Sequence, residues 1–185
     1  RARLRHDHRT RAPATGLNPG LRSRGRIGAI TTVAESRMTH TYFVTGGTGF
    51  IGRFLIDRLL EREGTVFVLV RKGSLGKLDA MRARWGSRAS RVVPVMGDLS
   101  RPKLGVSAAD LAKLKGQVKH LFHLAAIYDL AADAESQEKA NIDGTRNAVR
   151  FAEAVQAGCF HHVSSIAAAG LYDGVFREDM FEEAE

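Results

Sequence analysis

The sequence predicts an α/β fold built on a doubly wound parallel sheet. Residues 65–70 read Thr-Val-Phe-Val-Leu-Val, a continuous apolar run typical of a strand that is buried on both faces. Gly46, Gly49 and Gly52 stand three apart between an expected strand and an expected helix. Downstream of them, strand-like and helix-like segments alternate, and this alternation favours parallel strands joined by right-handed crossovers.

The elements follow one another from residue 41 onward. Apolar side chains recur every fourth residue in the first helix, Ser107 is expected to cap the third helix, and Gly64 and Gly158 are expected to end the first and last helices. We expect strands over residues 41–45, 65–70, 91–96, 119–124 and 159–164, and helices over residues 49–63, 75–85, 107–115 and 133–157.

The glycine-rich loop indicates a phosphate-binding turn. Gly46 allows a sharp turn off the strand, Gly49 lets a pyrophosphate approach the backbone, and Gly52 lets the helix pack closely. The free N–H groups and positive dipole end of that helix attract phosphate. The loop therefore predicts a dinucleotide, held by Gly46, Thr48, Gly49, Phe50, Ile51 and Gly52.

Two basic residues end the second expected strand. Arg71 lies 19 residues after Gly52, and Lys72 follows it. An acid near this position would accept from the ribose 2′-hydroxyl of NAD, whereas a guanidinium pairs with the 2′-phosphate of NADP. The alternative is a solvated basic loop. NADP(H) is the expected cofactor, with NAD as the second choice.

Composition divides the chain into two parts. Residues 1–37 carry nine Arg, no Lys and two acidic residues, so this leader holds +7 of the net charge of +8. It lacks a helical or strand period and is rich in Arg, Gly, Pro and Thr, as disordered segments are. An organelle transit peptide and a nucleic-acid-binding arm are alternatives, but upstream translation or an inert tail is the preferred interpretation. Residues 38–185 are expected to form the nucleotide-binding domain.

Several other classes of protein are disfavoured. No apolar stretch approaches the ~20 residues needed to cross a membrane. A single cysteine, Cys159, excludes an internal disulfide and favours a cytoplasmic location. Cys159 and His161 would share one face of a strand while His162 points away, and no second ligand cluster is evident, so no metal site is expected.

Five motifs in order carry a family resemblance. They are Thr45-Gly46-Gly47-Thr48-Gly49-Phe50-Ile51-Gly52, Asp98-Leu99, Leu124-Ala125-Ala126, Asn141-Ile142-Asp143-Gly144-Thr145 and Val163-Ser164-Ser165. Over residues 40–172 the chain resembles the extended short-chain dehydrogenase/reductases, of the epimerase/dehydratase superfamily. Within them it is most similar to the fatty-acyl and thioester reductase branch, of the male-sterility type.

The resemblance implies cofactor contacts beyond the glycine loop. Asp98 and Leu99 would reach the adenine, although a turn-forming aspartate would look the same. The small side chains of residues 124–126 would let the backbone lie beside the nicotinamide ribose. The candidates that it adds are Asp98, Leu99, Leu124, Ala125, Ala126, Asn141 and Ser164.

The resemblance also implies a catalytic residue. Ser165 would hydrogen-bond the reacting oxygen, with Ser164 as its structural neighbour and Asn141 supporting the active-site backbone. Two strand-end serines that satisfy backbone groups are the alternative reading.

One part of the family pattern is missing. The family uses a Tyr-x-x-x-Lys pair, and none of Tyr42, Tyr128 and Tyr172 is followed by Lys at the fourth position. We expect the pair beyond Glu185. The chain would then be an N-terminal fragment, truncated before the last strand or strands and the substrate-binding segments, and inactive alone.

These observations predict an NADP(H)-dependent oxidoreductase that moves hydride between nicotinamide and a carbonyl, thioester or alcohol carbon. The alternatives are an epimerase or dehydratase that uses the cofactor transiently, and a non-catalytic NADP-sensing protein. The expected partner is a small-molecule substrate, without nucleic acid or a membrane span, and a homo-oligomer is compatible with the sequence.

Overall fold

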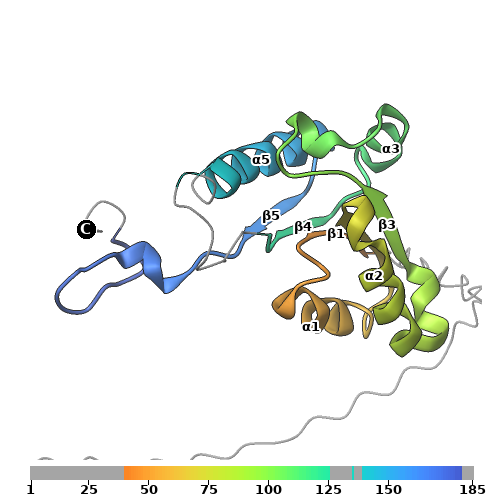
Figure 1. The fold of residues 1–185 in the computed structure, drawn as a ribbon, viewed down its shortest axis with the longest axis horizontal. Helices are drawn as coiled ribbons and strands as arrows, with labels where there is room; N and C mark the ends of the chain where they lie inside the picture. The colour runs from red at the N-terminus through yellow and green to blue at the C-terminus, as the bar shows by residue number, and fades with distance from the viewer. Residues whose placement is uncertain (1–39, 126–134, 136–138, 181–185) are drawn as a thin grey trace, which may run out of the picture. The chain divides into compact units, whose positions relative to one another are not determined.

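Five parallel strands form one sheet in the computed structural model, which describes residues 40–125, 135 and 139–180 (Figure 1). The strand order is β3-β2-β1-β4-β5. This order reverses direction between β1 and β4, which is the switch point where doubly wound sheets bind ligands. The strands are β1 His40–Thr45, β2 Gly64–Val70, β3 Val92–Met96, β4 His120–His123 and β5 Cys159–His162.

Helices cover both faces of the sheet, as the predicted doubly wound fold requires (Figure 1). One face packs α1 Phe50–Leu59 and α2 Leu75–Arg82, and the other packs α3 Ala108–Leu114 and α5 Gly144–Ala154. Short 3-10 turns span Lys72–Ser74, Ala83–Arg91, Pro102–Gly105 and Ile166–Ala169, and a π-helical turn spans Lys139–Asp143.

The strand alternation builds two apolar layers. Phe43 faces α5, and its ring centroid lies 4.6 Å from that of Phe151. Its neighbour Val44 points to the opposite face, where Ile56 of α1 and Trp85 are buried with it. Successive side chains on a strand alternate between faces, so a sheet buried on both sides gives the continuous apolar runs seen in the sequence.

Helix α1 is shorter than its periodicity predicts, because it ends at Leu59 and not at residue 63. The Arg91 guanidinium donates to the carbonyl oxygens of Leu60 and Arg62, and these contacts satisfy backbone groups after the last turn. Gly64 belongs to β2 with φ +136°, and a Cβ there would overlap the His40 carbonyl. The glycine serves strand pairing, so its prediction as a helix cap was wrong.

The last helix and strand also end earlier than expected. α5 ends at Ala154, four residues before Gly158, and β5 ends at His162. A Cβ on Gly158 would lie 2.9 Å from the Lys119 carbonyl oxygen, so this glycine lets the chain enter β5 close against β4. Residues 133, 134 and 136–138 of the expected helix lie outside the described residues.

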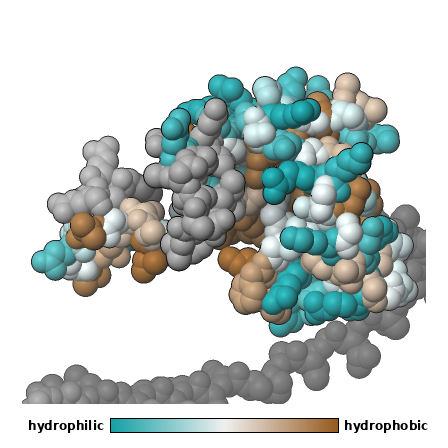
Figure 2. Space-filling model, in the orientation of Figure 1, coloured by the Kyte–Doolittle hydropathy of each residue, from teal (hydrophilic) through white to brown (hydrophobic). Residues whose placement is uncertain are grey.

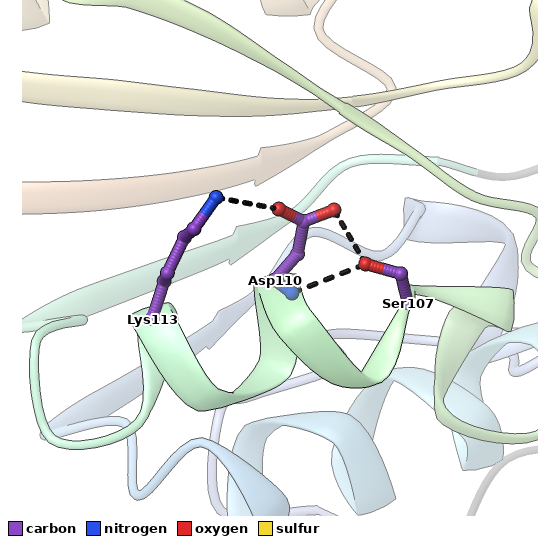
Figure 3. Close-up of polar contacts among 3 residues, drawn as sticks. All are labelled: Ser107, Asp110 and Lys113. Carbon is purple, nitrogen blue, oxygen red and sulfur yellow. Dashed lines mark hydrogen bonds and ion pairs between the residues drawn. The ribbon is translucent and has the colours of Figure 1, made fainter.

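The expected cap of α3 is present (Figure 3). The Ser107 Oγ accepts the backbone N–H of Asp110 at 3.1 Å and donates to its carboxylate at 2.8 Å. The Lys113 ammonium lies 3.7 Å from the same carboxylate. Ser107 thus satisfies one of the free N–H groups at the helix start.

Some expectations concern residues that the structure does not describe. The domain boundary after residue 37 is one of them, and Ala126 and Tyr128 are others. These stay predictions. None of the helices in the described part of the chain is long and apolar enough to cross a bilayer.

Candidate functional site

A cavity of about 390 Å³ opens at the carboxyl ends of the strands. Its walls come from the glycine loop after β1 and from the ends of β2, β3 and β4. It therefore lies at the topological switch point of the sheet. The lining residues are Gly46, Thr48, Gly49, Leu69, Val70, Arg71, Ser74, Gly97, Asp98, Leu99, Ser100, Leu124 and Ala125.

The loop geometry explains its glycines. Gly46 has φ +70°, and a Cβ there would lie 2.8 Å from the Ala125 nitrogen. A Cβ on Gly52 would overlap the Gly46 carbonyl, so Gly52 packs against the loop and not against the sheet as expected. A Cβ added to Gly49 would have only the Gly46 oxygen, at 3.2 Å, as a near neighbour. The open side of Gly49 leaves its backbone accessible to a ligand.

The N-terminus of α1 can receive an anion. Gly49 is the N-cap and offers no side-chain acceptor, and the first turn contains no acid. The N–H groups of this turn are therefore not capped by a side chain, and the positive end of the helix dipole is not neutralised. Arg53 adds a cation in the same turn, with its guanidinium 4.9 Å and 4.8 Å from the ring centroids of Phe50 and Phe54.

Opposite charges face the cavity from β2 and β3. Arg71 follows β2, and Asp98 follows β3 by two residues. Hydrogen bonds from the Ser100 backbone N–H at 2.9 Å and its hydroxyl at 2.8 Å lower the pKa of Asp98, and the charges of Arg71 and Arg101 lower it further. Asp98 is thus a fixed carboxylate acceptor at neutral pH.

A buried polar chain supports the β4 end of the cavity. His123 is 1% exposed, and it is hydrogen-bonded to the Thr45 hydroxyl at 2.7 Å and the Thr145 hydroxyl at 3.2 Å. Thr45 in turn accepts the Ala125 N–H at 3.3 Å. Burial lowers the pKa of His123 to about 4, with a contribution from His162. A neutral imidazole therefore links β1, β4 and α5 behind the cavity wall.

The loop after β3 is held from α5. The Asn147 amide donates to the Leu99 carbonyl at 2.8 Å. Gly144, at the junction between the π-helical turn and α5, would place a Cβ at an ordinary 3.6 Å from the Leu99 Cβ. Close packing was the expected reason for Gly144, and the structure shows room for a methyl group instead.

The expected cofactor residues fall into two groups. Eight of them line the cavity: Gly46, Thr48, Gly49, Arg71, Asp98, Leu99, Leu124 and Ala125. Gly52 is buried beneath the loop, and Phe50 and Ile51 are 72% and 56% exposed at the start of α1. Lys72 is exposed in the turn after Arg71. Asn141 lies in the π-helical turn.

Ser164 and Ser165 follow β5 and do not line the cavity. Ser165 is the N-cap of the 3-10 turn Ile166–Ala169, and its Oγ accepts the Ala167 N–H at 3.2 Å. This contact matches the strand-end alternative weighed for the pair, and it leaves the hydroxyl proton of Ser165 available for a second partner.

Sequence reasoning missed several residues of the site. Ser100 fixes Asp98, and the spacing Asp-x-Ser, typical of an Asx-turn, could have identified it. Ser74 and Gly97 also line the cavity. His123 directly precedes residues 124–126, but nothing in the local pattern indicates its partners, since Thr45 lies 78 residues away.

The family follows from the comparison with known proteins. Residues 44–185 match an NAD-binding family described as male sterility protein. The chain belongs to this family. The match covers the glycine loop, the cavity and the serines after β5, and it confirms the resemblance to the reductase branch of the extended short-chain dehydrogenase/reductases.

Curated relatives of this male sterility family member include large biosynthetic enzymes. The chain is 32% identical over 155 residues to a linear gramicidin synthase of Brevibacillus parabrevis, covering 76% of this chain and 3% of the synthase. It is 28% identical over 165 residues to "Putative fatty acyl-CoA reductase CG8303" of Drosophila melanogaster, covering 82% of this chain and 30% of that protein. The chain thus spans less than a third of either relative.

Solved structures give the same picture. The terminal R domain of the myxalamid PKS-NRPS pathway superposes with a TM-score of 0.67 at 30% identity, covering 77% of this chain and 39% of that one. The reductase domain of a non-ribosomal peptide synthetase from Mycobacterium tuberculosis gives 0.61 at 25% identity, covering 72% and 35%. The sheet order and the cavity therefore belong to a reductase-type Rossmann fold.

Proposed function

We propose that this chain binds NADP(H) and forms the cofactor-binding part of a reductase acting on a carbonyl or acyl thioester. The observation that carries the proposal is Arg71 on the wall of the switch-point cavity, across from a fixed Asp98 carboxylate. The relatives named as reductases support the type of reaction. When bound, the nicotinamide supplies the hydride.

The phosphates would lie over the glycine loop. Gly49 leaves its backbone open, and the first turn of α1 has N–H groups without a side-chain cap. An anion there gains both hydrogen bonds and the favourable end of the helix dipole. The residues present therefore fit a pyrophosphate.

The adenosine end would lie between β2 and β3. Arg71 would pair with the 2′-phosphate, and Lys72 in the next turn would add positive charge. Asp98, ionised at neutral pH, would accept from the adenine amino group, with Leu99 against the ring. Its hydrogen bonds to Ser100 keep the carboxylate in place as a ligand enters.

The nicotinamide end would lie along the end of β4. Leu124 and Ala125 line the cavity, and Ala126 follows in sequence. The small alanine side chain leaves space beside the backbone. Ser165 would hydrogen-bond the substrate oxygen and stabilise the charge that develops on it. Asn141 and Ser164 would support this arrangement.

Nucleotide titration tests the cofactor assignment. NADPH should bind the purified protein more tightly than NADH, and Arg71→Asp should weaken NADPH binding by at least about tenfold, because a charge-assisted contact contributes about 1.5–3 kcal/mol. The measurement is fluorescence of the reduced nucleotide. NADH affinity should be unchanged or improved in the same variant.

Arg88→Asp is the matched control. It makes the same change in net charge at an exposed residue of the Ala83–Arg91 turn, outside the cavity lining. If both variants lose NADPH affinity equally, the effect is long-range electrostatics and the assignment of Arg71 is wrong. Equal affinity of the parent protein for NADH and NADPH would also contradict it.

A further inference from the structure

Three metal-ligating side chains meet at the opposite end of the sheet from the cavity. His120 begins β4, Cys159 begins β5, and the parallel register pairs these two residues directly. His161 lies two residues along β5 and therefore on the same face. The sequence placed Cys159 and His161 together, but only the β4–β5 pairing adds the third ligand. Figure 1 shows these two strands side by side.

The donor atoms are already close to ligand spacing. The ligand atoms of His120, Cys159 and His161 all lie within 4.8 Å of one another. The His120 Nδ1 and the His161 Nε2 are 3.1 Å apart. Two nitrogens on a tetrahedral zinc ion, each at about 2.0–2.1 Å, are separated by about 3.3 Å. The two imidazoles would thus need only a slight opening to hold one ion.

Ring stacking holds the two imidazoles in place. The His161 ring lies 4.4 Å from Phe122 at an interplanar angle of 11°, and the His120 ring lies 5.9 Å from Tyr42 at 23°. Cys159 is free and exposed, so its side chain can rotate toward the nitrogens. A site whose two nitrogen ligands are pre-positioned loses little entropy when an ion binds.

The chemistry of the donors selects the ion. Two imidazole nitrogens and one thiolate favour zinc, cobalt or another divalent transition metal, whereas Mg²⁺ and Ca²⁺ prefer oxygen ligands. Burial, aided by the charges of His161, His40 and Arg62, lowers the pKa of His120, so its imidazole is neutral at neutral pH. Neutral imidazole is the form that ligates a metal.

We propose that His120, Cys159 and His161 bind one divalent transition-metal ion of the zinc class, with water as the fourth ligand. The ion would join the first residues of β4 and β5, at the edge of the sheet away from the nucleotide. The shared hydrogen bond between the imidazoles would be replaced by two metal–nitrogen bonds, and the thiol proton would be released on binding. The site is independent of the proposed function.

Cobalt is the probe, because tetrahedral Co²⁺ has visible absorption and a thiolate ligand adds a charge-transfer band. The purified protein, prepared without a histidine tag and stripped with a chelator, is titrated with Co²⁺. One equivalent should produce both features. Since the chain has one cysteine, the thiolate band reports on Cys159 and not on the histidines elsewhere. Added Zn²⁺ should then remove the bands by displacing cobalt.

The variants separate this site from other metal binding. Cys159→Ser should abolish the thiolate band, and His120→Ala should abolish the tetrahedral spectrum. His162→Ala is the matched control, because His162 is an exposed neighbour on the same strand whose ring stacks on His123 on the opposite face. It should keep both features. Circular dichroism confirms that each variant is folded.

The thermal melt supplies a second readout. Zn²⁺ should raise the melting temperature of the parent protein and of His162→Ala, and should not raise that of Cys159→Ser, since a ligand that binds only the folded state stabilises it. Absence of a thiolate band in the parent protein overturns the proposal. So does a His120→Ala variant that retains the tetrahedral spectrum, or a His162→Ala variant that loses it.

Discussion

At the scale of single residues, His123 shows how a buried group can shape a site that it does not line. Its ring joins Thr45 on β1 to Thr145 on α5, and Thr45 holds the Ala125 N–H at the cavity wall. A buried neutral imidazole with both nitrogens hydrogen-bonded satisfies three elements at once. We infer that His123 positions the end of β4.

His123 predicts a pH dependence of stability. Its pKa falls from 6.5 in an unfolded chain to about 4 in the folded protein, so between these values the unfolded state binds more protons. Stability should therefore be lost as the pH falls from about 6.5 toward 4, by up to about 3 kcal/mol, and this group should add no slope above that range. Urea unfolding at successive pH values measures it.

His123→Gln is the comparison for that measurement. The variant should be less stable at neutral pH but should lose less stability on acidification, because the amide does not titrate. His120 shifts in the same direction, so the difference between parent and variant isolates His123. Parallel pH profiles for the two proteins would show that His123 is not the responsible group.

At the scale of elements, helix ends are fixed by polar contacts more than by apolar periodicity. α3 begins at the Ser107 cap, as its sequence predicts. α1 stops where Arg91, from a different part of the chain, reaches its last carbonyls. Only the first of these two contacts is local in sequence.

Ser107→Ala should destabilise the protein by about 1 kcal/mol, because it removes the acceptor for the Asp110 N–H at the start of α3. The exposed Asp110–Lys113 ion pair should contribute little. Chemical denaturation measures the difference. Ser87→Ala changes an exposed serine outside any cap and should stay within about 0.5 kcal/mol of the parent. Equal effects of the two changes would refute the capping role.

At the scale of the whole molecule, apolar side chains remain exposed in two regions. Phe50, Ile51 and Phe54 lie on α1, and Ile166 and Leu171 lie after β5, at 94% and 88% exposure. Figure 2 shows hydrophobic atoms at the surface of both regions. The chain spans 39% and 35% of the two reductase domains to which it was compared. These surfaces are where further segments of a reductase would pack.

The serine after β5 is best tested in a protein that carries this chain together with such segments. Ser165→Ala should lower turnover by about 10²–10³, since it removes a donor to the developing negative charge, while the NADPH affinity stays unchanged. Steady-state carbonyl or thioester reduction and nucleotide titration give the two values. Ser87→Ala serves as the remote control. Full activity of Ser165→Ala would assign the role to another residue.

The sequence by itself determined the parallel α/β fold, the phosphate loop and the basic residue at the end of β2. These features are encoded locally, because a buried strand, a glycine turn and a helix start each leave a pattern within a few neighbouring residues. The same local logic correctly placed the cap at Ser107.

Only the tertiary structure decided which distant groups meet. The Thr45–His123 pair spans 78 residues and the His120–His161 pair spans 41, and the register of parallel strands brings each pair together. Arg91 ends α1 for the same reason, since its partners lie about 30 residues away. Strand register depends on packing over the whole sheet, so no window of sequence contains it.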